Sequence, residues 1–172
     1  MPPDQRLRLA TLADVPQMMD ILNHEIANTV NSFRLKPMTP QEGAKWWHAR
    51  EGGRYPAWVA ESVPAKVLGW ASLSRWSGYE GYAGTAEVSI WITPSAQGKG
   101  LGKALFSLLV DYARQGRFRV LLSRVEANNR ASLALHEKFG FTTIGTMHRV
   151  GEKFNRFLDV TLLELQLDML DA

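Results

Sequence analysis

The spacing of apolar residues along the chain predicts short strands that alternate with amphipathic helices. Apolar side chains recur at helical spacing between Val15 and Ile26, and Thr11 stands where an N-cap is expected. Thr39-Pro40 supplies an N-cap and a first-turn proline for a second helix. Helices are predicted over residues 11–26, 39–51, 103–115 and 130–139, and strands over 6–10, 58–61, 67–73, 88–93, 120–125, 141–150 and 158–167. Two early helices, a strand meander and a late strand–helix–strand unit predict an α/β protein with a mixed sheet.

Length and composition are typical of one soluble globular domain. The 172 residues suffice for a single domain over 1–172, and 45% of them are hydrophobic against 22% charged. No apolar run is long enough to span a membrane and the first residues do not read as a signal peptide, so we expect a cytoplasmic protein without a membrane partner. Cysteine is absent, which removes disulfides, thiolate metal sites and a cysteine nucleophile.

Charge and histidine spacing argue against two further kinds of site. The formal net charge is +3 and the isoelectric point is about 9.3, which favours an anionic ligand, but no dense cluster of Lys and Arg indicates a nucleic-acid surface. Neither His24-Glu25 nor His136-Glu137 is followed by the second histidine of a zinc helix. We therefore expect no nucleic-acid partner and no metal.

A strand, a glycine-rich loop and a helix N-terminus follow one another over residues 86–105. β-Branched and aromatic residues fill 88–93, a proline and several glycines interrupt them, and a helix opens at Lys103. Such a unit binds anions, since glycine lets the backbone approach and the first N–H groups of a helix are unpaired. Gln97 and Ala104 exclude a Walker loop, and Lys103 excludes a dinucleotide fingerprint. A lone loop of this kind also occurs in ordinary strand-to-helix turns.

The spacing that does fit, Gln97-x-x-Gly100-x-Gly102, resembles the signature of the GNAT superfamily of acyl-CoA-dependent N-acetyltransferases. Residues 129–141, a predicted helix that ends in a Gly-Phe pair, resemble the superfamily's second cofactor motif. Segments at 85–87, 132–136 and 150–159 resemble its phosphinothricin acetyltransferase-like branch. The resemblance spans nearly the whole chain. It implies the GNAT fold, a mostly antiparallel sheet that is splayed at the cofactor strand and flanked by about four helices.

The resemblance implies acetyl-CoA as the cosubstrate and assigns its contacts. The loop backbone over 98–103 is expected to bind the pyrophosphate, and the pantetheine arm is expected to lie along the strand like an additional β-partner. Asn129 is expected to bond that arm through its amide. Lys99 and Lys138 are expected to offer charge to phosphates, although a solvated surface lysine is the alternative for each. The full cofactor-binding set is Ile90, Trp91, Ile92, Gln97, Gly98, Lys99, Gly100, Leu101, Gly102, Lys103, Asn129 and Lys138.

Glu87 and His136 are the candidate catalytic residues. Glu87 begins a strand with apolar neighbours, where a carboxylate tends to have a raised pKa, and we expect it to take the acceptor's ammonium proton through water. The alternative for Glu87 is an ion pair with a nearby arginine. His136 stands where many superfamily members carry a tyrosine that protonates the CoA thiolate, and the resemblance implies the same role for its imidazole. The alternative for His136 is a structural histidine on a helix.

The acceptor site departs from the pattern of the branch. Members that acetylate amino-acid-like substrates tend to carry two arginines before the catalytic strand, and this chain has Ser77 and Ala83 there. We expect Arg75 to replace them as the ligand of an acceptor carboxylate, with Phe33 and Tyr82 as apolar walls. If Arg75 is instead a surface residue, neutral or cationic amines are expected to be the better acceptors.

The expected activity is transfer of an acetyl group from acetyl-CoA to the primary amine of a small amino-acid-like molecule of the phosphinothricin or methionine sulfoximine type. Two interpretations compete with it. The first is an N-acetyltransferase for a neutral or cationic amine or a peptide N-terminus, and the second is a catalytically silent CoA-binding module. The branch is commonly dimeric, which suggests a homodimer with residues 153–159 near its interface.

Overall fold

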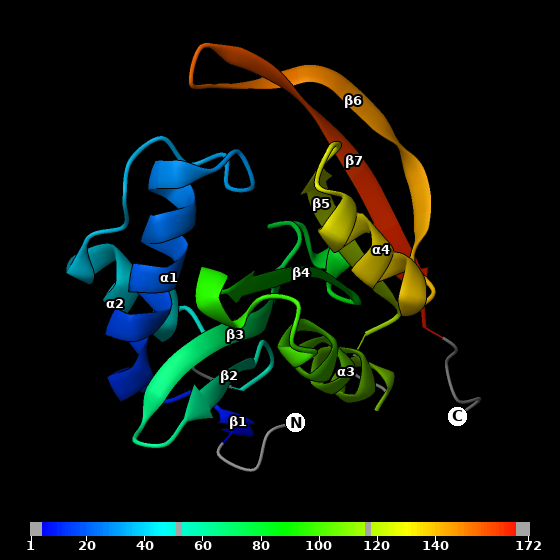
Figure 1. Ribbon diagram of the computed structural model, residues 1–172. Coiled ribbons are helices and arrows are strands. Elements are labelled where there is room, and N and C mark those ends of the chain that lie inside the picture. Colours follow the sequence, from blue (N-terminus) through cyan, green and yellow to red (C-terminus); the bar gives the residue numbers. More distant parts are fainter. Residues whose placement is uncertain (1–4, 51–52, 116–117, 168–172) are drawn as a thin grey trace.

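The computed structural model in Figure 1 describes residues 5–50, 53–115 and 118–167. The strands are β1 (Gln5–Leu9), β2 (Ala57–Ser62), β3 (Lys66–Arg75), β4 (Thr85–Ile92), β5 (Val120–Glu126), β6 (Thr142–Lys153) and β7 (Arg156–Gln166). The helices are α1 (Val15–Asn28), α2 (Pro40–His48), α3 (Leu101–Arg114) and α4 (Arg130–Lys138), and 3₁₀ turns occupy Leu12–Asp14, Glu80–Tyr82 and Pro94–Ala96. Each predicted helix and strand is present, with ends shifted by a few residues. The predicted end of the second helix at residue 51 lies outside the described residues.

The first two helices begin where the sequence places their caps. Thr39 and Glu42 form a reciprocal capping box, in which Thr39 Oγ1 accepts from Glu42 N at 3.2 Å and Glu42 Oε2 accepts from Thr39 N at 2.8 Å. Thr11 stands before the 3₁₀ turn that leads into α1, not directly before α1 itself. The Asp14 carboxylate accepts from the backbone N–H of Thr11 at 2.7 Å and from its hydroxyl at 2.9 Å, so this turn fixes the start of α1.

The seven strands form one mixed sheet in the order β1-β2-β3-β4-β5-β7-β6, which confirms the predicted fold class. All neighbours are antiparallel except β4 and β5, whose parallel pairing requires a crossover that α3 supplies. That pairing covers only three positions and ends at Glu87 and Leu122. Beyond them β4 continues beside β3 and β5 continues beside β7, so the two strands diverge. We call this divergence the β4–β5 fork. Within the described residues, the backbone of 88–92 has no strand partner on its β5 side.

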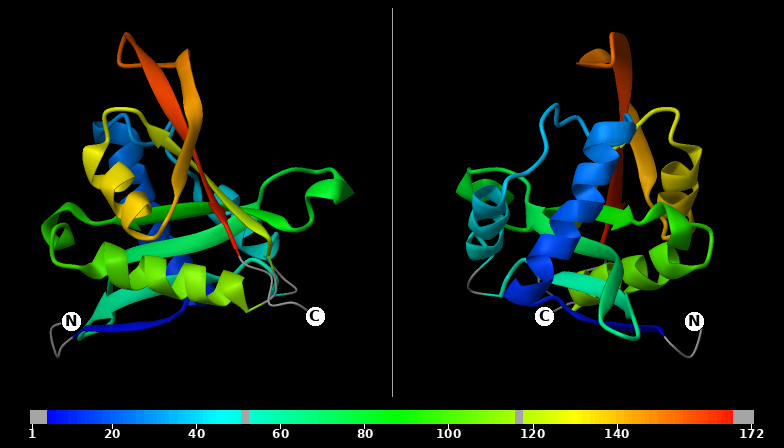
Figure 2. Two further views of the ribbon diagram at one scale, coloured as in Figure 1. Left: turned by 90° about the vertical axis from the view of Figure 1, so that its right-hand side faces the viewer. Right: turned by 60° about the vertical axis from the view of Figure 1, so that its left-hand side comes forward.

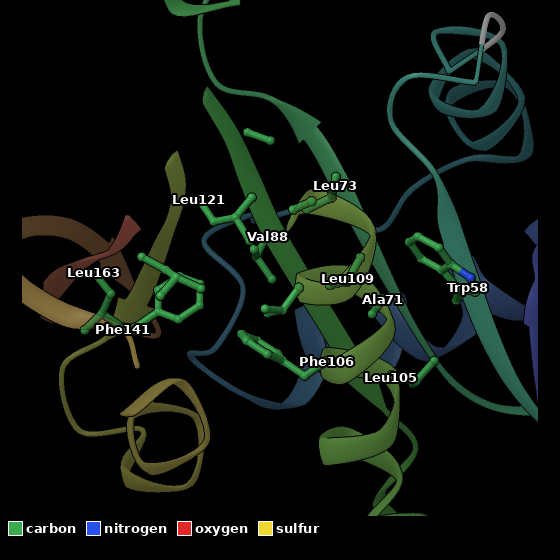
Figure 3. Packing of buried hydrophobic residues seen from close by; sticks show 14 of the residues in the cluster. Trp58, Ala71, Leu73, Val88, Leu105, Phe106, Leu109, Leu121, Phe141 and Leu163 are labelled. Carbon is green, nitrogen blue, oxygen red and sulfur yellow. The ribbon is translucent and has the colours of Figure 1, made fainter. Parts of the chain in front are cut away.

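Helices cover both faces of the sheet, as the two views of Figure 2 show. On one face α1 packs its apolar stripe on β2 and β3, where Trp70 is nearly fully buried. On the other face α3 presents Leu105, Phe106 and Leu109, all fully buried, to β3, β4 and β5 (Figure 3). Burial of each such side chain stabilises the fold by about 1.5–3 kcal/mol, so the α3 face anchors the loop that precedes α3.

Candidate active site

The candidate active site is a cavity of about 1040 Å³ that opens at the β4–β5 fork. Both diverging strands line it, together with α4 and residues 97–103, which lead from β4 into α3 and which we call the glycine loop. Residues 31–34, between α1 and α2, and the hairpin formed by β6 and β7 complete the wall. The cavity therefore joins segments that are far apart in the sequence.

The glycine loop ends in the N-terminus of α3 and lines the cavity. Gly98 and Gly100 have φ angles of +72° and +84°, a conformation that residues with a Cβ rarely adopt. Gly100 is the N-cap of α3, whose first N–H groups have no acceptor within the helix. Gly102 and Lys103 also line the cavity. This end of the cavity is suited to an anion, since unpaired N–H groups and a lysine meet there.

Three side chains predicted to bind cofactor hold the glycine loop itself. The Gln97 side chain donates to the Ile92 carbonyl at 3.1 Å, and Lys99 Nζ donates to the Ser95 carbonyl at 2.8 Å. Leu101 is fully buried in the core. Of the three, Gln97 is among the residues that line the cavity, whereas Lys99 and Leu101 are not. The side chains of Lys99 and Leu101 therefore support the loop from outside the cavity.

The remaining predicted cofactor residues line the cavity from β4 and α4. Ile90, Trp91 and Ile92 line it beside the unpartnered stretch of β4, and Lys138 lines it from the last turn of α4. Asn129 also lines it, but both ends of its amide are engaged within the protein. Its Oδ1 accepts from Ser132 N at 3.1 Å as the N-cap of α4, and its Nδ2 donates to Asn31 Oδ1 at 2.9 Å. These two bonds use one N–H and one lone pair of the amide, so its second N–H and second lone pair are left for a ligand.

Glu87 lies at the start of the fork and is paired with Arg124 of β5. Arg124 Nε and Nη2 donate to the two carboxylate oxygens of Glu87, each at 2.7 Å. Glu87 stands opposite Leu122, and Arg124 follows two residues later, so both side chains project from the same face of the sheet. The hydrogen bonds that Arg124 donates to Glu87 raise the pKa of Arg124. The ion pair considered as the alternative for Glu87 is therefore present, beside a cavity that both residues line.

His136 is buried against aromatic rings at the cavity wall. Its side chain is 1% exposed and makes edge-to-face contacts with Phe106 and Phe141, at centroid distances of 4.8 and 5.0 Å. Burial lowers the pKa of His136, and Nδ1 lies 2.8 Å from the Ser132 carbonyl. A carbonyl only accepts, so Nδ1 carries the proton and the neutral ring presents Nε2 as an acceptor. Among the described residues Nε2 has no hydrogen-bonding partner.

The three residues predicted to bind the acceptor are not brought together. Phe33 lines the cavity, whereas Arg75 and Tyr82 are not among its lining residues. Arg75 stands opposite Ala86 in the β3–β4 register. Ala86 directly precedes Glu87, so the side chain of Arg75 projects from the face of the sheet opposite to that of Glu87. Its guanidinium donates to the Gly78 carbonyl at 3.0 Å.

The residues between α1 and α2 are fastened to the β6–β7 hairpin. Lys153, which is 4% exposed, donates from Nζ to the Ser32 carbonyl at 2.7 Å, and burial lowers its pKa. The ring of Phe33 covers Gly151 so closely that a Cβ on this glycine would lie 2.1 Å from Phe33 Cε1. Phe33 therefore owes its position at the cavity to the absence of a side chain at residue 151.

Two cationic residues of the cavity wall escaped the sequence prediction. Arg124 and Arg34 both line the cavity, and Arg34 is paired with Glu42 at 2.9 Å. Arg34 had no local signal, because it lies in an irregular loop. Arg124 had one: it stands two residues after Leu122 in the strand predicted over 120–125, so these two side chains share a face. That signal pointed to Glu87 only once the parallel register of β4 and β5 was known.

Two kinds of feature are absent from the part of the chain that the structure describes. No group of three or more His, Asp or Glu side chains in this part is arranged to hold a metal ion. No helix over the same residues is both long and apolar enough to cross a membrane.

Comparison with known proteins identifies relatives along almost the whole chain. Residues 5–142 match the family model described as acetyltransferase (GNAT) domain. An L-methionine sulfoximine/L-methionine sulfone acetyltransferase of Pseudomonas paraeruginosa and an L-amino acid N-acyltransferase of Escherichia coli are each 37% identical over 162 residues, which is 94% of either chain. The crystal structure of a GNAT superfamily phosphinothricin acetyltransferase from Sinorhizobium meliloti, in complex with acetyl-CoA, has a TM-score of 0.91 and 32% identity, over 95% of this chain and 89% of that chain.

Proposed function

This chain belongs to the GNAT acetyltransferase family, and we propose that it transfers the acetyl group of acetyl-CoA to the primary amine of a small amino-acid-like acceptor. One observation carries the proposal: a single cavity connects the glycine loop to Glu87 along the edge of β4 that has no strand partner among the described residues. That arrangement suits a long anionic thioester whose acyl end must meet an amine next to a base.

The cavity residues fit acetyl-CoA. Gly98, Gly100 and Lys103 would receive the pyrophosphate, because they combine an approachable backbone, unpaired N–H groups and a positive charge. The backbone of 90–92 would pair with the pantetheine amides as a strand does. An unpaired N–H of the same strand would stabilise the oxyanion that forms on the thioester carbon, which is the usual role of a fixed backbone donor in acyl transfer.

Two residues would handle the protons of direct transfer. Glu87 takes one proton from the acceptor's ammonium, and the neutral amine attacks the thioester carbon. The nitrogen of the resulting intermediate is again cationic. Nε2 of neutral His136, which is buried and has no hydrogen-bonding partner among the described residues, would accept that second proton and return it to the departing thiolate of CoA. The products are the N-acetylated acceptor, CoA and the proton left on Glu87.

A neutral or cationic acceptor is the competing function, and one observation favours it. Arginines are missing at Ser77 and Ala83, and Arg75 is not among the residues that line the cavity. The discriminating experiment is a thiol-release screen with acetyl-CoA over amino acids, their carboxamides, polyamines and peptides, with Glu87→Gln as the matched variant. We expect fastest release with small amino acids and much slower release by Glu87→Gln. Acetyl-CoA binding without release for any amine would identify a silent CoA-binding module.

A further inference from the structure

The Glu87–Arg124 ion pair lies at the wall of the cavity, where the β4–β5 fork begins. It joins β4 to β5 beside the last position at which the two strands pair, and both side chains line the cavity. Arg124 uses Nε and Nη2 on Glu87, and within the described residues Nη1 makes no hydrogen bond. The guanidinium is half-exposed and also lies 5.3 Å from the ring centre of Trp76. One donor of Arg124 is thus available while the pair is closed.

Arg124 is the cation that contacts the proposed base. The cationic side chains that line the cavity within the described residues are Arg34, Lys103, Arg124 and Lys138. Lys103 belongs to the glycine loop, and Arg34 is already paired with Glu42. A guanidinium binds a carboxylate through two parallel hydrogen bonds, which a lysine does not match. Next to Glu87, therefore, Arg124 is the group best suited to an acceptor carboxylate.

Resting on the proposed acetyl transfer, we infer that the Glu87–Arg124 pair recognises the zwitterion of an α-amino acid, with the ammonium on Glu87 and the carboxylate on Arg124. In an α-amino acid the ammonium and the carboxylate are bonded to the same carbon, so the molecule can enter between two side chains that are in contact. When the pair opens, Glu87 exchanges Arg124 for the ammonium of the acceptor, and Arg124 exchanges Glu87 for its carboxylate. No charge is then left unpaired. The Arg124 side chain is 53% exposed and the Glu87 side chain 17%, and the solvent on the arginine side limits what this pair contributes to stability.

The same arrangement would discriminate against amines that lack a carboxylate. Such an amine offers nothing to Arg124, which then remains bidentate on Glu87 and occupies both oxygens of the base. A carboxylate draws Arg124 away and frees Glu87 at the moment when the ammonium arrives. Arg124 would thus determine specificity, and Arg75 would not be required.

The test compares L-methionine sulfoximine with its carboxamide in wild type and Arg124→Gln. We expect wild type to prefer the amino acid at least tenfold in kcat/KM, and Arg124→Gln to lose that preference through a raised KM for the amino acid, with acetyl-CoA affinity unchanged. Arg6→Gln is the matched control, because Arg6 is paired with Glu61 across β1 and β2 and does not line the cavity. It should keep the preference.

Each contrary result has a distinct meaning. Equal rates of wild type with acid and amide would overturn the inference even if Arg124→Gln did not fold. An equal loss of both rates in Arg124→Gln would also overturn it, since Arg124 would then only position Glu87. Loss of the preference in Arg75→Gln in place of Arg124→Gln would assign the carboxylate to Arg75. Absence of thiol release by wild type with every amine would defeat the proposed function itself.

Discussion

Replacement of Gly100 by valine tests whether the glycine loop binds the cofactor. Gly100 has a φ of +84°, where an L-residue costs roughly 1–2 kcal/mol and a β-branched one is a rare outlier. A typical domain is stable by about 5–15 kcal/mol, so Gly100→Val should still fold. The loop is expected to relax away from the positive φ, which would misdirect the N–H groups at the start of α3. We expect acetyl-CoA affinity to fall at least tenfold, which corresponds to about 1.4 kcal/mol.

Calorimetric titration with acetyl-CoA measures this loss, and Gly53→Val is its matched control. Gly53 has a φ of +71° and, like Gly100, no atom within 4 Å of an added Cβ, but it does not line the cavity. Both variants should lower the melting temperature similarly, and only Gly100→Val should weaken binding. Gly102 has an ordinary φ and room for a methyl group near Leu135, so Gly102→Ala tests close approach of the ligand alone. Wild-type affinity in a folded Gly100→Val protein would refute the assignment of the loop.

Three further predictions concern the catalytic end of the cavity. Glu87→Gln should lower turnover by a factor on the order of 10²–10⁴, chiefly at low pH, where the acceptor is an ammonium and most needs a base. A pH–rate profile equal to that of wild type would reject the base role. Burial lowers the pKa of His136 in the folded protein below the usual histidine pKa of about 6.5. Near that pH the unfolded chain therefore binds a proton at His136 more readily than the folded chain does. The stability of the wild type should therefore fall as the pH drops below about 6.5. In His136→Gln the urea unfolding midpoint should depend less on pH over this range. An unchanged pH dependence would assign the effect to other groups. Gly151→Ala should displace Phe33 and raise the KM of the acceptor but not that of acetyl-CoA, and unchanged values for both would remove Phe33 from the acceptor site.

The elements of the fold could be predicted from the sequence because their signals are local. Capping residues at Thr39, the glycines around Gly100 and the apolar spacing of α3 each act within a few positions. The contacts of the site are not local. Glu87 and Arg124 are 37 residues apart and meet only through the parallel register of β4 and β5.

Two side chains show how register and local competition change a role that a motif implies. Arg75 lies close to Glu87 in the sheet, but it pairs with Ala86, so its side chain projects from the other face. The alternation of side chains along β3 predicts that face only when the register with β4 is known. Asn129 is at the position that the motif predicts, yet its amide caps α4 and contacts Asn31, which lies 98 residues away. Neither the pairing of Arg75 with Ala86 nor the contact of Asn129 with Asn31 was visible from the neighbouring sequence.

Acetyl transfer to an amino acid is tested directly by the mass of the product formed from acetyl-CoA and L-methionine sulfoximine, with released CoA quantified in the same reaction. We expect one N-acetylated amino acid for each CoA released, at a rate that Glu87→Gln lowers strongly. Release of CoA without an acetylated amine, or equal product from the enzyme and from a reaction without it, would contradict acetyl transfer to an amino-acid-like acceptor.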